Sequence, residues 1–241
     1  MARISYGRAE AAAFAATRHL PRDGLTAWRR AVAAHLAPRP GIRILDLGAG
    51  TGWWATAFRD WYGVEVVAVE PSAAMRARCT APVIGGDALA IPLRTASVDA
   101  AWISTVLHHV PDLDAAAAEL RRVVRPGAPV LIRSAFAGRH ENITLFRYFP
   151  EAIAVLDTYP SVEQVRAAFH GAGFAFVALE PVPQVTAPSL DAALAALRRE
   201  AHTPLMQISD AAYEAGLARY RAAAETATGP VIDALDLLVL R

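Results

Sequence analysis

A short apolar segment that runs directly into a glycine-rich loop constrains the fold of this chain more than any other feature. The stretch Ile44–Gly52 reads ILDLGAGTG: its apolar start predicts a buried strand, and glycines follow at positions 48, 50 and 52. A helical pattern then runs from Gly52 to Trp61, and the β-branched segment Val64–Val69 predicts the next strand. Such a loop brings the backbone close to a ligand just past the end of a strand.

The alternation of strands and helices continues along the chain. Further strands are predicted at 82–84, 98–104, 128–136, 174–179 and 234–240, and helices at 72–79, with Ser72 as N-cap, at 112–124 and at 161–170. This order predicts an α/β fold: a Rossmann-like, mostly parallel, seven-stranded sheet with helices on both faces.

Composition limits the classes of partner and compartment. The 241 residues include 24 basic and 23 acidic ones, a formal charge of +1, which gives no electrostatic footprint for nucleic acid or for an anionic membrane surface. The single cysteine, Cys79, excludes an intrachain disulfide and a cysteine-based metal site. No apolar run approaches the roughly 18 residues of a spanning helix, and the start lacks the apolar core of a signal peptide. We therefore expect a cytoplasmic protein without a metal.

The glycine spacing distinguishes between two kinds of ligand. A dinucleotide site has the pattern G-x-G-x-x-G, whereas the third glycine here comes one residue early and is followed by Trp53 and Trp54, where a pyrophosphate would dock. Asp46 before the glycines suits a positively charged or donating ligand group, and Glu70, about 20 residues on, suits ribose hydroxyls. A nucleoside with a cation, such as S-adenosylmethionine, fits these residues better than a dinucleotide.

Four segments in order resemble a known family. They are ILDLGAGTG, VVAVEPS (Val66–Ser72), GDALAIPLRTASVDAAWISTVLHHVPD (Gly86–Asp112) and ELRRVVRPGAPVLIRS (Glu119–Ser134). They are similar to the successive motifs of class I S-adenosylmethionine-dependent methyltransferases, and most of all to the small-molecule subgroup of the ubiquinone/menaquinone-biosynthesis type. The resemblance is strong over residues 39–136 and weak in the later strands.

The resemblance implies a cofactor site for S-adenosylmethionine, with S-adenosylhomocysteine as its product. Asp46 and the Gly48-Ala49-Gly50 backbone would hold the amino-acid tail, Glu70 would bind both ribose hydroxyls, and Pro71 would pack near the adenine. Asp87 would accept from the exocyclic amine of adenine, and the Ala88 amide would donate to the ring. Ser104 would line the methionine end, and Tyr6 would close over the cofactor.

The chain is predicted to form one domain, residues 1–241, because no Ser/Gly-rich or charged linker interrupts the sequence. We expect this domain to have three functional parts. These parts are an N-terminal helical lid (1–38), a cofactor-binding half (39–136), and a substrate-side half (137–241) with insertions at 137–160, expected to be irregular, and at 181–230, expected to be helical.

Methyl transfer is an in-line displacement that depends mainly on positioning, and a general base helps when the acceptor is a hydroxyl or an acidic carbon. His108 and His109 follow the fourth strand, and His140 follows the fifth, so these three are candidate bases; packing and capping are the structural alternative. His202 is a weaker candidate, and Arg133 is a candidate carboxylate anchor unless a salt bridge occupies it.

The predicted activity is methylation of a small-molecule acceptor at oxygen, nitrogen or carbon, in secondary or cofactor metabolism. A cyclase or rearrangement catalyst that retains the cofactor is the alternative, and an inactive binding module or a dehydrogenase fits the motifs less well. The sequence leaves the acceptor and the oligomeric state open, because the apolar helices of 181–230 suit a pocket and a homodimer interface alike.

Overall fold

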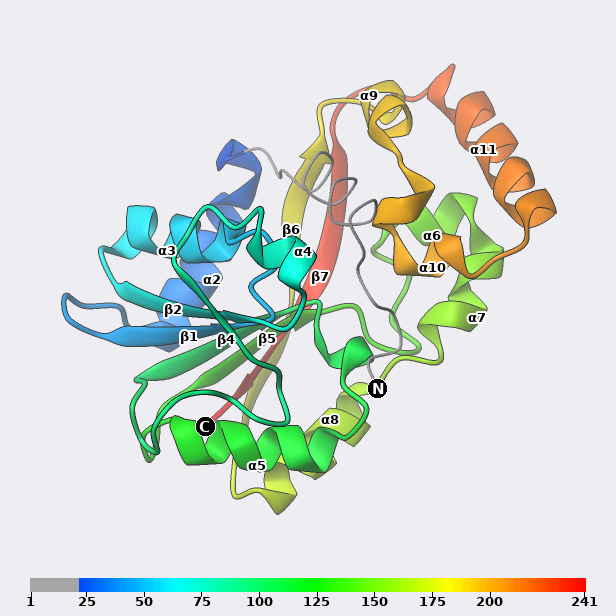
Figure 1. Ribbon diagram of the computed structural model, residues 1–241. Helices are drawn as coiled ribbons and strands as arrows, with labels where there is room; N and C mark the ends of the chain where they lie inside the picture. Colours follow the sequence, from blue (N-terminus) through cyan, green and yellow to red (C-terminus); the bar gives the residue numbers. More distant parts are fainter. Residues whose placement is uncertain (1–21) are drawn as a thin grey trace.

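The computed structural model describes residues 22–241 and contains one seven-stranded sheet (Figure 1). The strands are β1 (Arg43–Leu47), β2 (Glu65–Glu70), β3 (Val83–Gly85), β4 (Ala100–Ser104), β5 (Val130–Ser134), β6 (Phe176–Ala187) and β7 (Val231–Leu240). Their order is β3-β2-β1-β4-β5-β7-β6, and β7 pairs antiparallel with both of its neighbours. The remaining pairs are parallel, which confirms the predicted sheet.

Helices cover both faces of the sheet and also cap one end of it (Figure 1). They are α2 (Thr26–Leu36), α3 (Trp53–Tyr62), α4 (Ala73–Arg76), α5 (Leu113–Val123), α6 (Thr144–Tyr148), α7 (Ile153–Leu156), α8 (Val162–Gly171), α9 (Leu190–Ala196), α10 (Thr203–Met206) and α11 (Asp210–Ala224). Ser72 caps α4 as predicted, although α4 ends at Arg76 and not at Cys79. None of the helices within residues 22–241 combines the length and apolarity of a membrane-spanning helix.

The alternation of side chains along each strand creates two cores. On one face, side chains such as Leu45, Ile103 and Ile132 pack with the inner sides of α5 and α8. On the other face, neighbouring positions such as Ile44 and Leu131 pack with α2 and α3. Because both faces are buried, the central strands are apolar throughout, and their polar ends stand out in the sequence.

The two antiparallel strands at the sheet edge depart from the sequence expectations. β6 begins at Phe176 and runs through Pro181 and Pro183 to Ala187, whereas a strand ending at Leu179 was expected. Proline lacks an amide donor, and β6 tolerates it because this strand lies at the edge and pairs only with β7. The first residues of the expected helical insertion at 181–230 are therefore strand, and the insertion proper begins after Ala187.

A helical cap stands beyond the C-terminal ends of the parallel strands. It consists of α6, α7, α9, α10 and α11 (Figure 1), and its own core includes Phe149, Leu156, Leu205 and Tyr220. The segment 138–160, expected to be irregular, contributes α6 and α7 to this cap, so that expectation was wrong. The lid expected over 1–38 is described only from Arg22 onward, and there it forms α2 against the sheet.

Candidate functional site

A cavity of about 1100 Å³ lies between the C-terminal ends of the parallel strands and the cap. Its wall includes most of the residues that the sequence assigns to a cofactor: Gly48, Ala49, Gly50, Glu70, Pro71, Asp87, Ala88 and Ser104. They come from four consecutive strand ends in the sheet order β3-β2-β1-β4. The topology thus brings together residues that are up to 56 positions apart in the chain.

Two further predicted cofactor residues are Tyr6 and Asp46. Tyr6 lies outside the described residues. Asp46 is only 1 % exposed and lies under the glycine loop, and its Oδ2 has no hydrogen-bond partner among residues 22–241. Burial, together with the negative charge of Glu70, raises the pKa of Asp46 to about 7.

The glycine loop is held by backbone bonds and by close packing. The amides of Gly48 and Ala49 both donate to the carbonyl of Val69, at 2.8 and 3.0 Å. Gly48 has a φ of 73°, and a Cβ there would come within 2.4 Å of Val106. Gly52 has a φ of 80°, and a Cβ there would meet the sulfur of Cys79 at 2.5 Å. These glycines are therefore required by the protein's own packing as well as by any ligand.

Glu70 ends β2 and faces the loop that follows β1. Its Oε2 accepts from the Gly50 amide at 2.9 Å, and its Oε1 accepts from the Ser72 amide at 2.8 Å. Burial raises the pKa of Glu70, and these two backbone donors oppose that effect. A carboxylate has about four acceptor positions, so Glu70 retains capacity to accept from hydroxyls of a ligand in the cavity.

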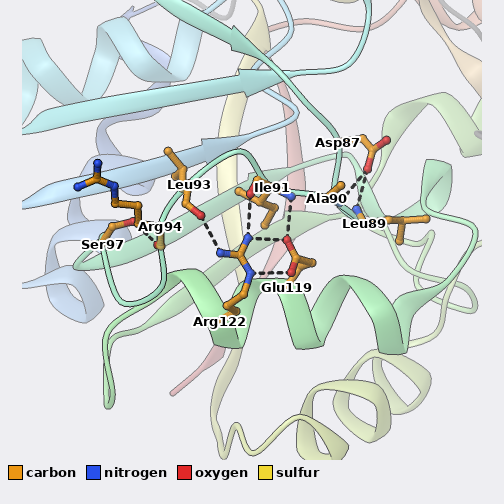
Figure 2. A network of polar contacts seen from close by, with 9 residues as sticks. All are labelled: Asp87, Leu89, Ala90, Ile91, Leu93, Arg94, Ser97, Glu119 and Arg122. Atoms are coloured by element: carbon orange, nitrogen blue, oxygen red, sulfur yellow. Dashed lines mark hydrogen bonds and ion pairs between the residues drawn. The ribbon is translucent and has the colours of Figure 1, made fainter.

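Asp87 follows β3 in a tight turn. Its Oδ1 accepts from the amides of Leu89 and Ala90 at 2.8 and 3.1 Å, a local arrangement that fixes the side chain beside the cavity (Figure 2). The neighbouring Ala88 is buried, and both residues line the cavity.

An ion pair on α5 holds the loop that carries Asp87. Arg122 donates to the carbonyls of Leu93 and Ile91 at 2.7 and 2.8 Å, and Glu119 accepts from the Ile91 amide at 2.9 Å (Figure 2). Arg122 also donates to both oxygens of Glu119, which lowers the pKa of that carboxyl. These contacts connect the loop to α5.

The candidate bases differ in whether they line the cavity. His108 and His109 line the cavity, with ring centroids 4.0 Å apart, and Tyr159 stacks on His108 at 4.2 Å. Burial lowers the pKa of His109 to about 4, so its imidazole is neutral near pH 7. His140 is not part of the cavity wall and packs 6.5 Å from Phe146, whereas His202 does line the cavity.

Arg133 and a group of tryptophans form the wall near Ser104. Arg133 is 5 % exposed, and it donates to Ser104 Oγ at 3.2 Å and to Gln184 Oε1 at 2.8 Å. Its guanidinium lies 5.0 Å from the ring of Trp28 and 5.4 Å from that of Trp54. Trp53 and Trp54 both line the cavity.

The cap side of the cavity is mostly apolar. Its lining includes Ile143, Leu145, Phe146, Leu156, Ala187, Ala193, Ala196, Leu197, Tyr220, Val231 and Leu235. Polar residues there include Thr186 and Asp233, which hydrogen-bond to each other at 3.2 Å across β6 and β7. The sequence analysis missed Gln184, Thr186 and Asp233, and the only pattern that could have indicated them was polar residues alternating along these long strands. Phe146 and Tyr159 line the cavity, whereas Tyr148 and Phe149 pack within the cap.

Comparison with known proteins finds relatives for the part of the site that the strand ends and their loops form. Residues 45–132 match a family described as a methyltransferase domain. A demethylmenaquinone methyltransferase from Beutenbergia cavernae is 39 % identical over 110 residues, which cover 44 % of this chain and 45 % of that relative. The chain therefore spans less than half the length of this relative. The family match at residues 45–132 leaves out the cap.

Solved structures extend the similarity to the whole fold. A protein described as a methyltransferase from an antibiotic biosynthesis pathway of Anabaena variabilis has a TM-score of 0.72 at 18 % identity, over 89 % of this chain and 96 % of that one. The cyclase SpnF has a TM-score of 0.61 at 18 % identity, over 93 % of this chain and 83 % of that one. At such low identity these likenesses establish the fold and not the reaction.

Proposed function

We infer that this chain, whose residues 45–132 match a methyltransferase domain, is a class I S-adenosylmethionine-dependent methyltransferase that transfers a methyl group to a small-molecule acceptor. One observation supports this above all. The matched segment supplies the glycine loop, Glu70 and Asp87, and all three line one cavity that continues into the apolar cap.

The cofactor assigned to the strand side is S-adenosylmethionine, which brings a methyl group on a positively charged sulfur. Asp87 and the Ala88 amide would bind the adenine edge, and Glu70 would accept from the ribose hydroxyls. The donors on Glu70 already fix its orientation, so little side-chain freedom is lost on binding. Ser104 and the glycine loop would border the methionine end.

The chain's contribution to methyl transfer is alignment and proton removal. The nucleophile of the acceptor must approach opposite the carbon–sulfur bond at near-attack distance. His109 and His108 line the cavity, and a neutral His109 would accept a proton from an acidic acceptor bound there. We favour these two over His140 as bases, because His140 lies outside the cavity wall.

The acceptor proposed for the cap side is a largely apolar small molecule. A cavity of about 1100 Å³ exceeds the roughly 300–1,000 Å³ usual for a single drug-sized ligand, which suits a cofactor and an acceptor together. Aliphatic and aromatic side chains dominate the cap side, and Thr186 with Asp233 offers a polar contact within it.

Calorimetric titration with S-adenosylhomocysteine and, separately, with NAD tests the cofactor. We expect micromolar binding of the first and none of the second; no binding of S-adenosylhomocysteine would contradict the proposal. Acceptors can then be screened by the release of S-adenosylhomocysteine from S-adenosylmethionine. The alternative, a cofactor-retaining cyclase, predicts conversion of a substrate without that release.

A further inference from the structure

The ends of β1, β4 and β5 place three groups in one row at the cavity. Leu47 pairs with Ile103, and Ser104 pairs with Arg133, so the glycine loop, Ser104 and Arg133 occupy adjacent strand ends. Neighbouring strands are about 4.8 Å apart, which puts the Arg133 backbone about 10 Å from that of Gly48. That separation lets a long side chain reach a ligand lying on the loop.

The side chains of Asp46, Ser104 and Arg133 share one face of the sheet. Asp46 occupies the same face as Trp102 and Leu131, because these residues are direct partners across β1, β4 and β5. Two positions further along their strands, Ser104 and Arg133 return to that face. The hydrogen bond between Ser104 and Arg133 agrees with this placement.

The guanidinium of Arg133 is held in place by neutral groups. Gln184 Oε1 accepts from Arg133 and also from the indole N–H of Trp28, at 2.8 and 2.9 Å. Trp28 and Trp54 both lie within cation–π distance of the guanidinium. These contacts fix the planar fork at the cavity, and such a fork matches the geometry of a carboxylate.

The charges along the row have opposite signs at its two ends. Glu70 and Asp46 lie on the β2 and β1 side, and Arg133 lies on the β5 side. A zwitterion bound along this row would therefore be oriented, with its ammonium toward the acids and its carboxylate toward the arginine. The amino-acid tail of the proposed cofactor is such a zwitterion.

We propose that Arg133 binds the carboxylate of the cofactor's amino-acid tail, an inference that rests on the function proposed above. The same contact explains why Trp28, Trp54 and Gln184 surround the guanidinium, because together they keep a cation at the methionine end of the site. The cation is then directed at the cofactor and not at the acceptor in the cap.

The test compares S-adenosylhomocysteine with its decarboxylated analogue, which keeps the adenosine, the sulfur and the amine. Both are titrated calorimetrically into the wild type and Arg133→Met. The wild type should bind the analogue at least about tenfold more weakly than S-adenosylhomocysteine, and Arg133→Met should bind the two almost equally. Arg133→Lys, which keeps the charge without the fork, should retain part of the preference and covers the case in which the methionine variant fails to fold.

Arg121→Met is the matched control. Arg121 also lies over an aromatic ring, 5.7 Å from the centroid of Phe174, but it does not line the cavity. This variant should keep the wild-type preference. An unchanged preference in the folded Arg133 variants would overturn the inference while leaving the proposed function intact. A wild type that binds neither compound would overturn both.

Discussion

The carboxylate of Glu70 accepts a hydrogen bond from the backbone amide of Gly50 at 2.9 Å, so the acid at the end of β2 braces the loop at the end of β1. Ser72 supplies a second backbone donor to the same carboxylate. The loop and the acid therefore hold each other in position before any ligand arrives. Such preorganisation reduces the entropy lost on binding.

We expect Glu70→Ala to weaken binding of S-adenosylhomocysteine by about 1.5–3 kcal/mol, because charge-assisted hydrogen bonds to the ribose are lost together with the brace on Gly50. Calorimetry measures this change. Glu65→Ala serves as the control, because Glu65 lies on the same strand but pairs with Arg43 at the opposite end, outside the cavity. Equal affinity in the Glu70 variant and the wild type would remove Glu70 from the cofactor site.

The ionised side chain of Asp46 should lower the free energy of unfolding at neutral and higher pH. Its folded pKa of about 7 lies above the ordinary value of 3.8, so its contribution to stability is fully present below about pH 3.8 and is lost as the pH rises through about 7. We expect Asp46→Asn to be more stable than the wild type by about 1–3 kcal/mol near pH 8, with little difference near pH 4. Urea unfolding at the two pH values measures this, and a variant that is less stable near pH 8 would contradict it.

The same ionisation should appear in ligand binding. If the Asp46 carboxylate attracts the ammonium of the cofactor, the affinity for S-adenosylhomocysteine should increase as the pH rises through about 7, by at most about tenfold per pH unit. Asp46→Asn should flatten this dependence. Calorimetry between about pH 6 and pH 8 separates the two curves, and identical slopes would exclude the interaction.

Arg122→Met should loosen the loop that carries Asp87 and Ala88. The substitution removes the donors to the carbonyls of Leu93 and Ile91 and leaves Glu119 without its ion pair (Figure 2). We expect a loss of about 1–2 kcal/mol of stability and several-fold weaker binding of S-adenosylhomocysteine.

Arg94→Met is the control for that change. Arg94 is exposed in the same loop, and its substitution removes the same charge without touching the brace. Thermal unfolding and calorimetry on both variants test the idea. Equal effects of the two substitutions would point to net charge and not to the brace.

His109→Asn should lower turnover by about 100-fold or more if His109 removes a proton, while cofactor affinity stays nearly unchanged. Because its pKa is about 4, activity limited by this base should decline only as the pH falls toward about 4. His140→Asn, outside the cavity wall, is the control and should be close to the wild type. The rate is followed with an acceptor found in the screen, and a fully active His109→Asn would eliminate it as the base.

The half of the cavity formed by the strand ends was predictable from the sequence because its polar residues lie at the ends of apolar strands. The segments Ile44–Leu47 and Val66–Val69 are largely buried, so Asp46 and Glu70 stand out against their neighbours. Parallel strand ends meet at one edge of a sheet, which made their proximity foreseeable. The segment that matches the family, residues 45–132, contains these same strand ends.

The cap side of the cavity was not predictable in this way. β6 contains Pro181 and Pro183, which normally argue against a strand, and only its edge position makes them acceptable. Gln184 and Arg133 meet across 51 residues through the antiparallel edge, a pairing that no local pattern encodes. The cap helices α6, α7, α9 and α10 have only four to seven residues each, which is too short for a helical period to reveal which side faces the cavity.

The antiparallel edge also affects how the cap side of the cavity could change during evolution. Ala187 at the end of β6 pairs with Val231 at the start of β7, so the chain leaves the sheet and returns to it at neighbouring positions. The intervening residues 188–230 supply much of the cap wall, including Ala193, Leu197 and Tyr220. A segment whose two ends already touch can be lengthened, shortened or replaced at a small cost in loop-closure entropy. Selection could thus exchange this segment as a unit while the strand ends and the glycine loop below it remain the same.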